Sequence, residues 1–149
     1  MNIDTVEISA ELIHKMKNHT EQAYPHECCG ILTGKREDDG PVTVRDALTV
    51  GNRISDELRG KHFAIDPMEI YKHEKNLENS GLEIIGFFHS HPNAPAVLSR
   101  EDEEGMIPHQ LYVLLSVSDG EHAVKGSVSI TAWCKEKDII REIGLKNRI

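Results

Sequence analysis

The pattern of apolar and polar positions predicts two helices in the first half of the chain. The first covers residues 9–24, where Ser9 is suited to cap the helix and Pro25 to stop it. The second begins at Asp66-Pro67, because a capping aspartate followed by proline is preorganised for a helix, and it ends at residues 79–81. Each has an apolar stripe at helical spacing, so we expect one face of each to be covered.

Short apolar runs bounded by turn residues predict strands between and after these helices. They cover residues 28–34, 42–50, 61–65, 82–89, 111–117 and 124–134. The exposed turn at 36–41 predicts a hairpin between the first two strands, and the unbroken apolar runs at 82–89 and 111–117 predict cover on both faces. Residues 138–149 predict a short terminal helix. Two helical elements around five or six short strands indicate a single-domain α/β sandwich.

Length and charge restrict the possible functions. A chain of 149 residues is the size of one domain that can bury its own core. The net charge of −8, from 17 basic and 25 acidic side chains, leaves no basic stripe for a phosphate backbone, so we expect no nucleic-acid partner. No apolar run approaches the roughly 20 residues that span a bilayer, so we expect no membrane partner.

The cysteines and the first twenty residues bear on location. Residues 1–20 contain neither a basic leader nor an apolar signal core. The three cysteines are an odd number, and two of them, Cys28 and Cys29, are adjacent, so they provide no disulfide framework and no Cys-x-x-Cys motif. Reduced cysteines suit the cytoplasm, and we expect a cytoplasmic protein.

Candidate metal ligands stand at the end of the apolar run 82–89. His89 and His91 are two positions apart, so on a strand both imidazoles share a face about 6–7 Å apart and can bind one ion. Asp102 can supply a third ligand if the chain turns back and begins a helix near Ser99. Two simpler interpretations stay open. Nine histidines make a His-x-His pair unsurprising, and Ser99-x-x-Asp102 alone is typical of a helix start.

Together the two segments resemble the signature of the JAMM (MPN-plus) metalloprotease family. That signature is His-x-His-Pro, six residues, then Ser-x-x-Asp, and here it comprises His89, His91, Pro92, Ser99 and Asp102. The family also has a glutamate far upstream, beside a strand of small and apolar residues. Residues 25–34 match that context and place Glu27 in the glutamate position. The resemblance covers roughly residues 8–134 and is closest to the short, free-standing bacterial and archaeal members.

The resemblance implies a fold and an organisation. It implies a mixed, largely antiparallel central sheet flanked by helices, of the cytidine-deaminase-like kind. It also implies that residues 1–149 form one JAMM/MPN-plus domain. The loop 93–98 is short and no long insertion is evident, so the selective elements of relatives that cut polyubiquitin are absent and we do not expect polyubiquitin as substrate.

The resemblance also implies a chemistry. One Zn²⁺ per chain, bound by His89, His91 and Asp102, keeps a position open for a water that acts as the nucleophile at an amide carbonyl. Glu27 is implied as the general base and later the proton donor to the leaving amine. The alternative is that Glu27 is a surface glutamate beside a proline turn. Ser99 is implied both to cap the helix that carries Asp102 and to donate a hydrogen bond to the oxyanion.

Neighbouring residues of similar chemistry fit structural roles better. Ser90 points to the opposite strand face from the two histidines, so we expect a structural hydrogen bond there. Cys28 and Cys29 face opposite sides of their strand, so at most one approaches the site, and core packing is the expected role of both. His26 and His109 lack motif spacing and are expected on the surface or in loops.

Other metal chemistries require residues that this chain lacks. Neither His26-Glu27 nor His73-Glu74 is followed by histidine three residues on, so the helical His-Glu-x-x-His protease pattern is absent. A zinc deaminase requires a Pro-Cys-x-x-Cys segment. A β-lactamase-like His-x-His is followed two residues later by aspartate and then histidine, where this chain has Asn93 and Ala94.

The sequence therefore predicts a zinc-dependent peptidase or isopeptidase. The residues themselves support metal-assisted amide hydrolysis. The substrate, a small ubiquitin-like or sulfur-carrier protein cut after its C-terminal Gly-Gly tail, is implied by the resemblance alone, and the group released from that tail is left open. The alternative is a non-catalytic MPN-type scaffold that binds a partner through the same surface. A third interpretation is a purely structural zinc ion.

Overall fold

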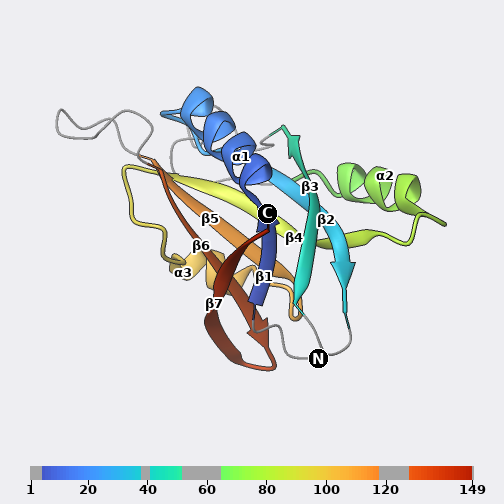
Figure 1. Ribbon diagram of the computed structural model, residues 1–149. Helices are drawn as coiled ribbons and strands as arrows, with labels where there is room; N and C mark the ends of the chain where they lie inside the picture. The colour runs from blue at the N-terminus through green and yellow to red at the C-terminus, as the bar shows by residue number, and fades with distance from the viewer. Residues whose placement is uncertain (1–4, 38–40, 52–64, 118–127, 149) are drawn as a thin grey trace.

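The computed structural model describes residues 5–37, 41–51, 65–117 and 128–148 (Figure 1). Its strands are β1 (Thr5–Ser9), β2 (Cys29–Arg36), β3 (Val42–Val50), β4 (Glu83–Pro92), β5 (Leu111–Val117), β6 (Ser129–Glu136) and β7 (Ile139–Arg148). Its helices are α1 (Ala10–Ala23), α2 (Pro67–Leu77) and α3 (Arg100–Glu104). The predicted strand at 61–65 lies, apart from Ile65, outside the described residues, as do residues 124–127 of the predicted strand at 124–134.

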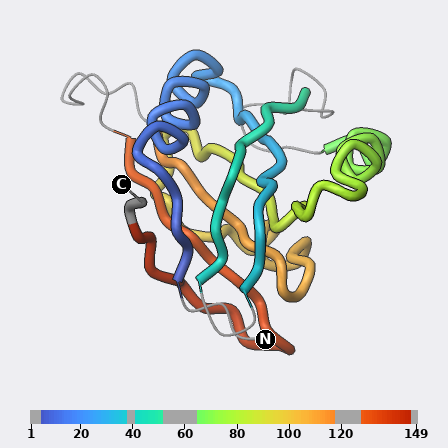
Figure 2. The backbone as a smooth tube through the Cα atoms, turned by 45° about the vertical axis from the view of Figure 1, so that its right-hand side comes forward, coloured from blue at the N-terminus to red at the C-terminus, as the bar shows by residue number. Residues whose placement is uncertain are grey.

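The strands close into a barrel in the order β1-β3-β2-β4-β5-β6-β7 (Figure 2). Four neighbouring pairs are antiparallel, namely β2–β3, β2–β4, β5–β6 and β6–β7, and three are parallel, namely β1–β3, β1–β7 and β4–β5. The mixed sheet was predicted correctly. The predicted sandwich flanked by helices needs correction, because the sheet closes on itself and α1 and α2 cover it only in part, on separate sides (Figure 1).

Both predicted helices are present, with the predicted caps. The Ser9 hydroxyl accepts a hydrogen bond from the Leu12 backbone N at 3.1 Å, and the Asp66 carboxylate accepts one from the Met68 N at 2.9 Å. Met16 of α1 is 1% exposed and packs into the barrel core, so this helix covers one end of the core. None of the helices in the described part of the chain is long and apolar enough to cross a membrane.

The terminal helix predicted at 138–149 is wrong, because these residues form β7. Lys137 has φ +55°, which allows a tight turn after β6, and Ile139 then begins a strand antiparallel to it. On its other side β7 pairs in parallel with β1. This strand was not predicted from the sequence, although Val6 and Ile8 alternate with polar neighbours. Short apolar runs fit either a helix or a strand, and here the available partner strands decide.

Two layers of apolar side chains hold the site strand β4 in place. The barrel interior contains Phe88 and Leu115, whereas Phe87 and Leu114 belong to a second cluster on the outer face. Residues 85–91 of β4 are buried throughout, as the unbroken apolar run predicted. The side chains of β4 thus alternate between an interior core and an outer cluster, and the outer cluster adjoins the candidate site.

Candidate metal centre

Strand β4 carries His89 and His91 on the outer face of the barrel. In the parallel pairing with β5, His89 is opposite Leu114, a residue of the outer cluster. His91, two residues further on, shares this face by strand parity. His89 is 1% exposed and His91 7% exposed, so both imidazoles are removed from bulk water. Ser90 between them is buried and points the other way, where its hydroxyl accepts a hydrogen bond from the Cys28 backbone N at 2.9 Å.

Asp102 reaches this face from α3, after the loop 93–98 has reversed the chain direction. Asn93 has φ +58°, a left-handed conformation that asparagine tolerates well, and its backbone N donates to the Val117 carbonyl at 2.7 Å. At the helix start, the Ser99 hydroxyl accepts from the Asp102 N at 3.0 Å and the Asp102 carboxylate accepts from the Ser99 N at 2.9 Å. This reciprocal capping box sets the direction of the Asp102 side chain.

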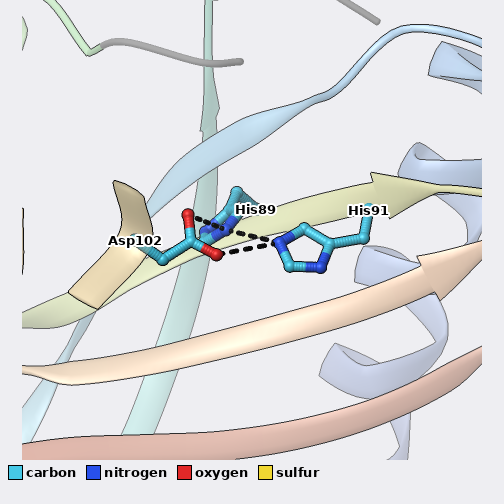
Figure 3. A group of neighbouring side chains, drawn as sticks. All are labelled: His89, His91 and Asp102. Atoms are coloured by element: carbon cyan, nitrogen blue, oxygen red, sulfur yellow. Dashed lines mark hydrogen bonds and ion pairs between the residues drawn. The ribbon is translucent and has the colours of Figure 1, made fainter. Parts of the chain in front are cut away.

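The three side chains converge on one point (Figure 3). His89 Nε2 lies 3.1 Å from Asp102 Oδ1, His91 Nε2 lies 3.0 Å from Asp102 Oδ2, and the two Nε2 atoms are 3.1 Å apart. With zinc bonds of about 2.0–2.1 Å in tetrahedral geometry, neighbouring ligand atoms are about 3.3 Å apart. Two imidazole nitrogens and one carboxylate group at these separations therefore suit a zinc ion.

The loop 93–98 orients the His91 ring. His91 Nδ1 is 3.0 Å from the Pro95 carbonyl oxygen. A carbonyl only accepts, so Nδ1 carries a proton, and Nε2 is the ring nitrogen that faces Asp102 and His89 and that can bind a metal once it is deprotonated. A second hydrogen bond of this kind is typical of metal-binding histidines. Pro95 was not predicted from the sequence, since a contact made by a backbone carbonyl leaves no signal in residue type.

Without a metal, the electrostatics of the triad act differently on its two histidines. Burial lowers the pKa of His89, which keeps its ring neutral. Burial alone would also lower the pKa of His91, but its hydrogen bonds to Asp102 and Pro95 raise it overall, so a metal ion has to displace a proton from this ring. Burial alone would raise the pKa of the Asp102 carboxyl, but the hydrogen bonds from His89 and His91 hold it well below its usual range. A deprotonated carboxylate and neutral imidazoles are the forms that ligate a divalent ion.

Glu27 lies in the short segment before β2, alongside the end of β4. Cys29 pairs with His89, and the Ser90 backbone N donates to the Cys28 carbonyl at 3.0 Å, so continuing this register brings Glu27 opposite His91. Glu27 is 7% exposed, which rules out the surface glutamate interpretation. Burial raises the pKa of its carboxyl to about 7, and the nearby His91 ring and Asp102 carboxylate act on it in opposite directions.

The residues expected to be structural are placed as predicted. Cys28 points into the barrel and contacts the Thr20 hydroxyl at 3.7 Å, whereas Cys29 shares the face of His89, with its thiol 3.9 Å from the Val50 carbonyl. Both are buried free thiols, and in the described part of the chain the group that can hold a metal contains neither of them. His26 and His109 are exposed.

The sequence of this chain is similar to that of a known protein family and of several named proteins. The family described as "Prokaryotic homologs of the JAB domain" matches residues 9–133. A desampylase from Pyrococcus furiosus is 31% identical over 118 residues, which cover 78% of this chain and 73% of the relative. A probable TtuB-protein conjugate cleaving protease from Thermus thermophilus is 30% identical over 91 residues, 61% of this chain and 56% of the relative. A 26S proteasome non-ATPase regulatory subunit 14 from Dictyostelium discoideum is 29% identical, and the match spans 43% of its length.

Two solved structures have the same fold as this chain. The solution structure of a protein from Desulfitobacterium hafniense superposes with a TM-score of 0.78 at 28% identity, over 97% of this chain and 94% of that one. One from Salinibacter ruber has a TM-score of 0.69 at 27% identity, over 95% and 91% of the two chains. The match over residues 9–133, the converging histidines and aspartate, and these structural neighbours together show that the chain belongs to the prokaryotic JAB-domain branch of the JAMM family.

Proposed function

We propose that this protein is a zinc-dependent JAMM-type peptidase or isopeptidase, built as one domain over residues 1–149, that hydrolyses the amide bond after the C-terminal Gly-Gly tail of a small ubiquitin-like or sulfur-carrier protein. One observation carries the proposal. The ligand-type atoms of His89, His91 and Asp102 lie within 4.8 Å of one another, beside the buried carboxyl of Glu27.

The relatives support the class of substrate. Two of them are named as a desampylase and as a protease that cleaves TtuB–protein conjugates, and the matched region covers 73% of the first and 56% of the second. Both names describe removal of a small protein from a conjugate. The cytoplasm, as the proposed location, is compatible with three buried free thiols.

Each residue of the site has a role in this proposal. His89, His91 and Asp102 would hold the zinc ion, which when bound polarises the amide carbonyl and makes a water molecule more acidic. Glu27 takes a proton from the attacking water and passes it to the leaving amine. With a pKa of about 7, its carboxyl exchanges protons readily near neutral pH.

Ser99 completes the site. Its hydroxyl oxygen accepts the hydrogen bond from the Asp102 backbone N, which uses one lone pair and leaves the O–H proton available. We propose that this proton is donated to the oxyanion that forms at the attacked carbonyl, so that capping and catalysis use different parts of one hydroxyl.

The edge of β3 is a place where the extended C-terminal tail of the substrate can add as a further strand. In the described ranges, β3 pairs with β1 only at Val42 and Thr43, whereas its pairing with β2 continues to Val50. Val50 is opposite Cys29, which in turn is opposite His89. A Gly-Gly tail that paired with this edge of β3 near Val50 would lie three strand spacings from β4, about 14 Å at 4.7–4.9 Å per strand. We propose this edge as the path along which the tail approaches the site, with the residues at its end reaching past β3 and β2 to the metal centre.

The test is Glu27→Gln, which preserves size but removes the proton acceptor. Zinc content, tail affinity and single-turnover cleavage of a fusion with a ubiquitin-like Gly-Gly tail are measured on the parent and the variant. Cleavage should fall by about 10²–10⁴-fold while zinc and affinity stay close to the parent. Glu103→Gln makes the same change at an exposed position of α3 and should cleave normally.

The outcomes of this test distinguish a hydrolase from a non-catalytic scaffold. Equal cleavage by the parent and Glu27→Gln would remove Glu27 from the mechanism. Binding without cleavage by the parent, across a panel of tails, would favour the non-catalytic scaffold instead.

A further inference from the structure

Three consecutive carbonyls of the loop 93–98 are hydrogen-bonded by side chains of the barrel. The Ser116 hydroxyl of β5 donates to Ala94, His91 Nδ1 donates to Pro95 at 3.0 Å, and the Thr131 hydroxyl of β6 donates to Ala96 at 2.6 Å. The Pro95 carbonyl, which orients the His91 ring, therefore lies between two carbonyls that accept hydrogen bonds from hydroxyl groups. These hydroxyls come from strands that carry none of the motif residues.

Thr131 is itself held in place by the next outward-facing residue of its strand. Trp133 Nε1 donates to the Thr131 hydroxyl oxygen at 2.8 Å, and side chains two apart on a strand share a face. The hydroxyl therefore accepts one hydrogen bond and donates another, so its donating direction toward Ala96 is defined. Linked hydrogen bonds of this kind reinforce one another.

We propose that Thr131 and Ser116 are positioning residues of the metal centre, which hold the loop so that the Pro95 carbonyl keeps His91 in the tautomer that binds metal. This proposal rests on the proposed function only in taking His91 as a metal ligand. The apolar contacts of Ala96 and Leu98, 6% and 8% exposed, keep the loop against the outer cluster but do not set the direction of a carbonyl.

The experiment uses a matched set of variants. Thr131→Val removes the hydroxyl and keeps the shape, whereas Thr131→Ser keeps the hydroxyl. Thr43→Val is the matched control, because Thr43 is a buried strand threonine opposite Lys35, at the far end of β2 from Cys29. Ser116→Ala removes the second anchor, whose hydrogen bond is more exposed than that of Thr131, and it tests the proposal if Thr131→Val fails to fold.

The first readout is the affinity of the metal-free protein for Zn²⁺, measured in competition with a chromophoric chelator. Thr131→Val should bind about 10–100-fold more weakly, the usual effect of losing a residue that orients a metal ligand. Ser116→Ala should weaken binding in the same direction. Thr131→Ser and Thr43→Val should both stay close to the parent.

Two further readouts need no metal. Trp133 is the single tryptophan of the chain, so its fluorescence emission should shift in Thr131→Val and return in Thr131→Ser. Proton–nitrogen NMR of His91, followed upward in pH until the ring has lost its second proton, reports which ring nitrogen stays protonated. The parent should be protonated at Nδ1, and Thr131→Val should show a mixture.

The outcomes separate this inference from the proposed function. Parental zinc affinity and an unchanged His91 tautomer in Thr131→Val, or in Ser116→Ala if only that variant folds, would overturn the positioning role. An equal loss of affinity in Thr43→Val would assign the effect to general stability and overturn it as well. If the parent itself binds no zinc, the proposed metal site fails, and the tautomer measurement still decides whether these hydroxyls orient His91.

Discussion

Ser99 and Asp102 bind each other twice. The Ser99 hydroxyl accepts from the Asp102 backbone N at 3.0 Å, and the Asp102 carboxylate accepts from the Ser99 N at 2.9 Å through Oδ2, the oxygen that also contacts His91. A helix cap and a candidate metal ligand are therefore the same structural unit. Loss of the hydroxyl removes half of the cap and the proposed oxyanion donor together.

Ser99→Ala should keep its zinc but cleave at least about 10²-fold more slowly, because an oxyanion donor is worth that much. It should also lose about 1 kcal/mol of unfolding free energy with the cap. Ser9→Ala is the control, since Ser9 caps α1 by the same bond to Leu12, away from the site. Loss of stability without loss of rate in Ser99→Ala would leave Ser99 with a capping role alone.

Each of the three ligand candidates should be needed for full zinc occupancy. His89→Ala, His91→Ala and Asp102→Ala each remove one of three converging ligand atoms, so elemental analysis should find less than one zinc per chain. His109→Ala, an exposed histidine outside the group, should retain the parental content. Undiminished zinc in all three site variants would disprove the assignment.

The buried Glu27 carboxyl predicts a pH dependence of stability in the metal-free protein. Its pKa is about 7 in the folded protein and ordinarily 4.5. Between these values the folded state keeps a proton that the unfolded state has lost, so the unfolding free energy falls as pH rises through this window and levels off above about pH 7. Glu27→Gln lacks this contribution, so its stability relative to the parent should rise with pH and reach an advantage of about 3 kcal/mol.

Urea unfolding of both metal-free proteins between about pH 4 and pH 8 measures this difference. Glu103→Gln, at an exposed carboxyl, should follow the parent at every pH. A constant difference between Glu27→Gln and the parent across the range would show that Glu27 does not titrate in this window.

Gly86 should be intolerant of any side chain. A Cβ at this position would lie 2.0 Å from the Leu111 carbonyl oxygen, whereas at Gly144, also in a strand, it would meet nothing within 4 Å. Gly86→Ala should therefore lower the unfolding free energy by about 1–3 kcal/mol. Gly144→Ala should be neutral or stabilising by about 0.5–1 kcal/mol, since glycine weakens a strand. Thermal unfolding compares the two, and equal stabilities would contradict the close approach of β4 to β5.

Local signals in the sequence predicted much of the fold and the position of the site. The caps at Ser9 and Asp66 and the stop at Pro25 act over a few residues, so both helices were predicted with nearly their observed ends. The bounds of β3 and β5 were also predicted, because apolar runs between polar turns are local features. The spacing of His89, His91 and Asp102 predicted three ligand-type side chains that the structure brings together, whereas Glu27 was named through the family resemblance.

Only the tertiary structure decided what depends on distant partners. β7 is a strand because β6 and β1 are available on either side, and its pairing with β1 closes the barrel where the sequence predicted a sandwich. The burial that raises the pKa of Glu27 comes from packing beside β4. The hydroxyls of Thr131 and Ser116 reach the loop 93–98 only because β5 and β6 lie beside β4, since hydrogen bonds between distant segments depend on the folded path of the chain.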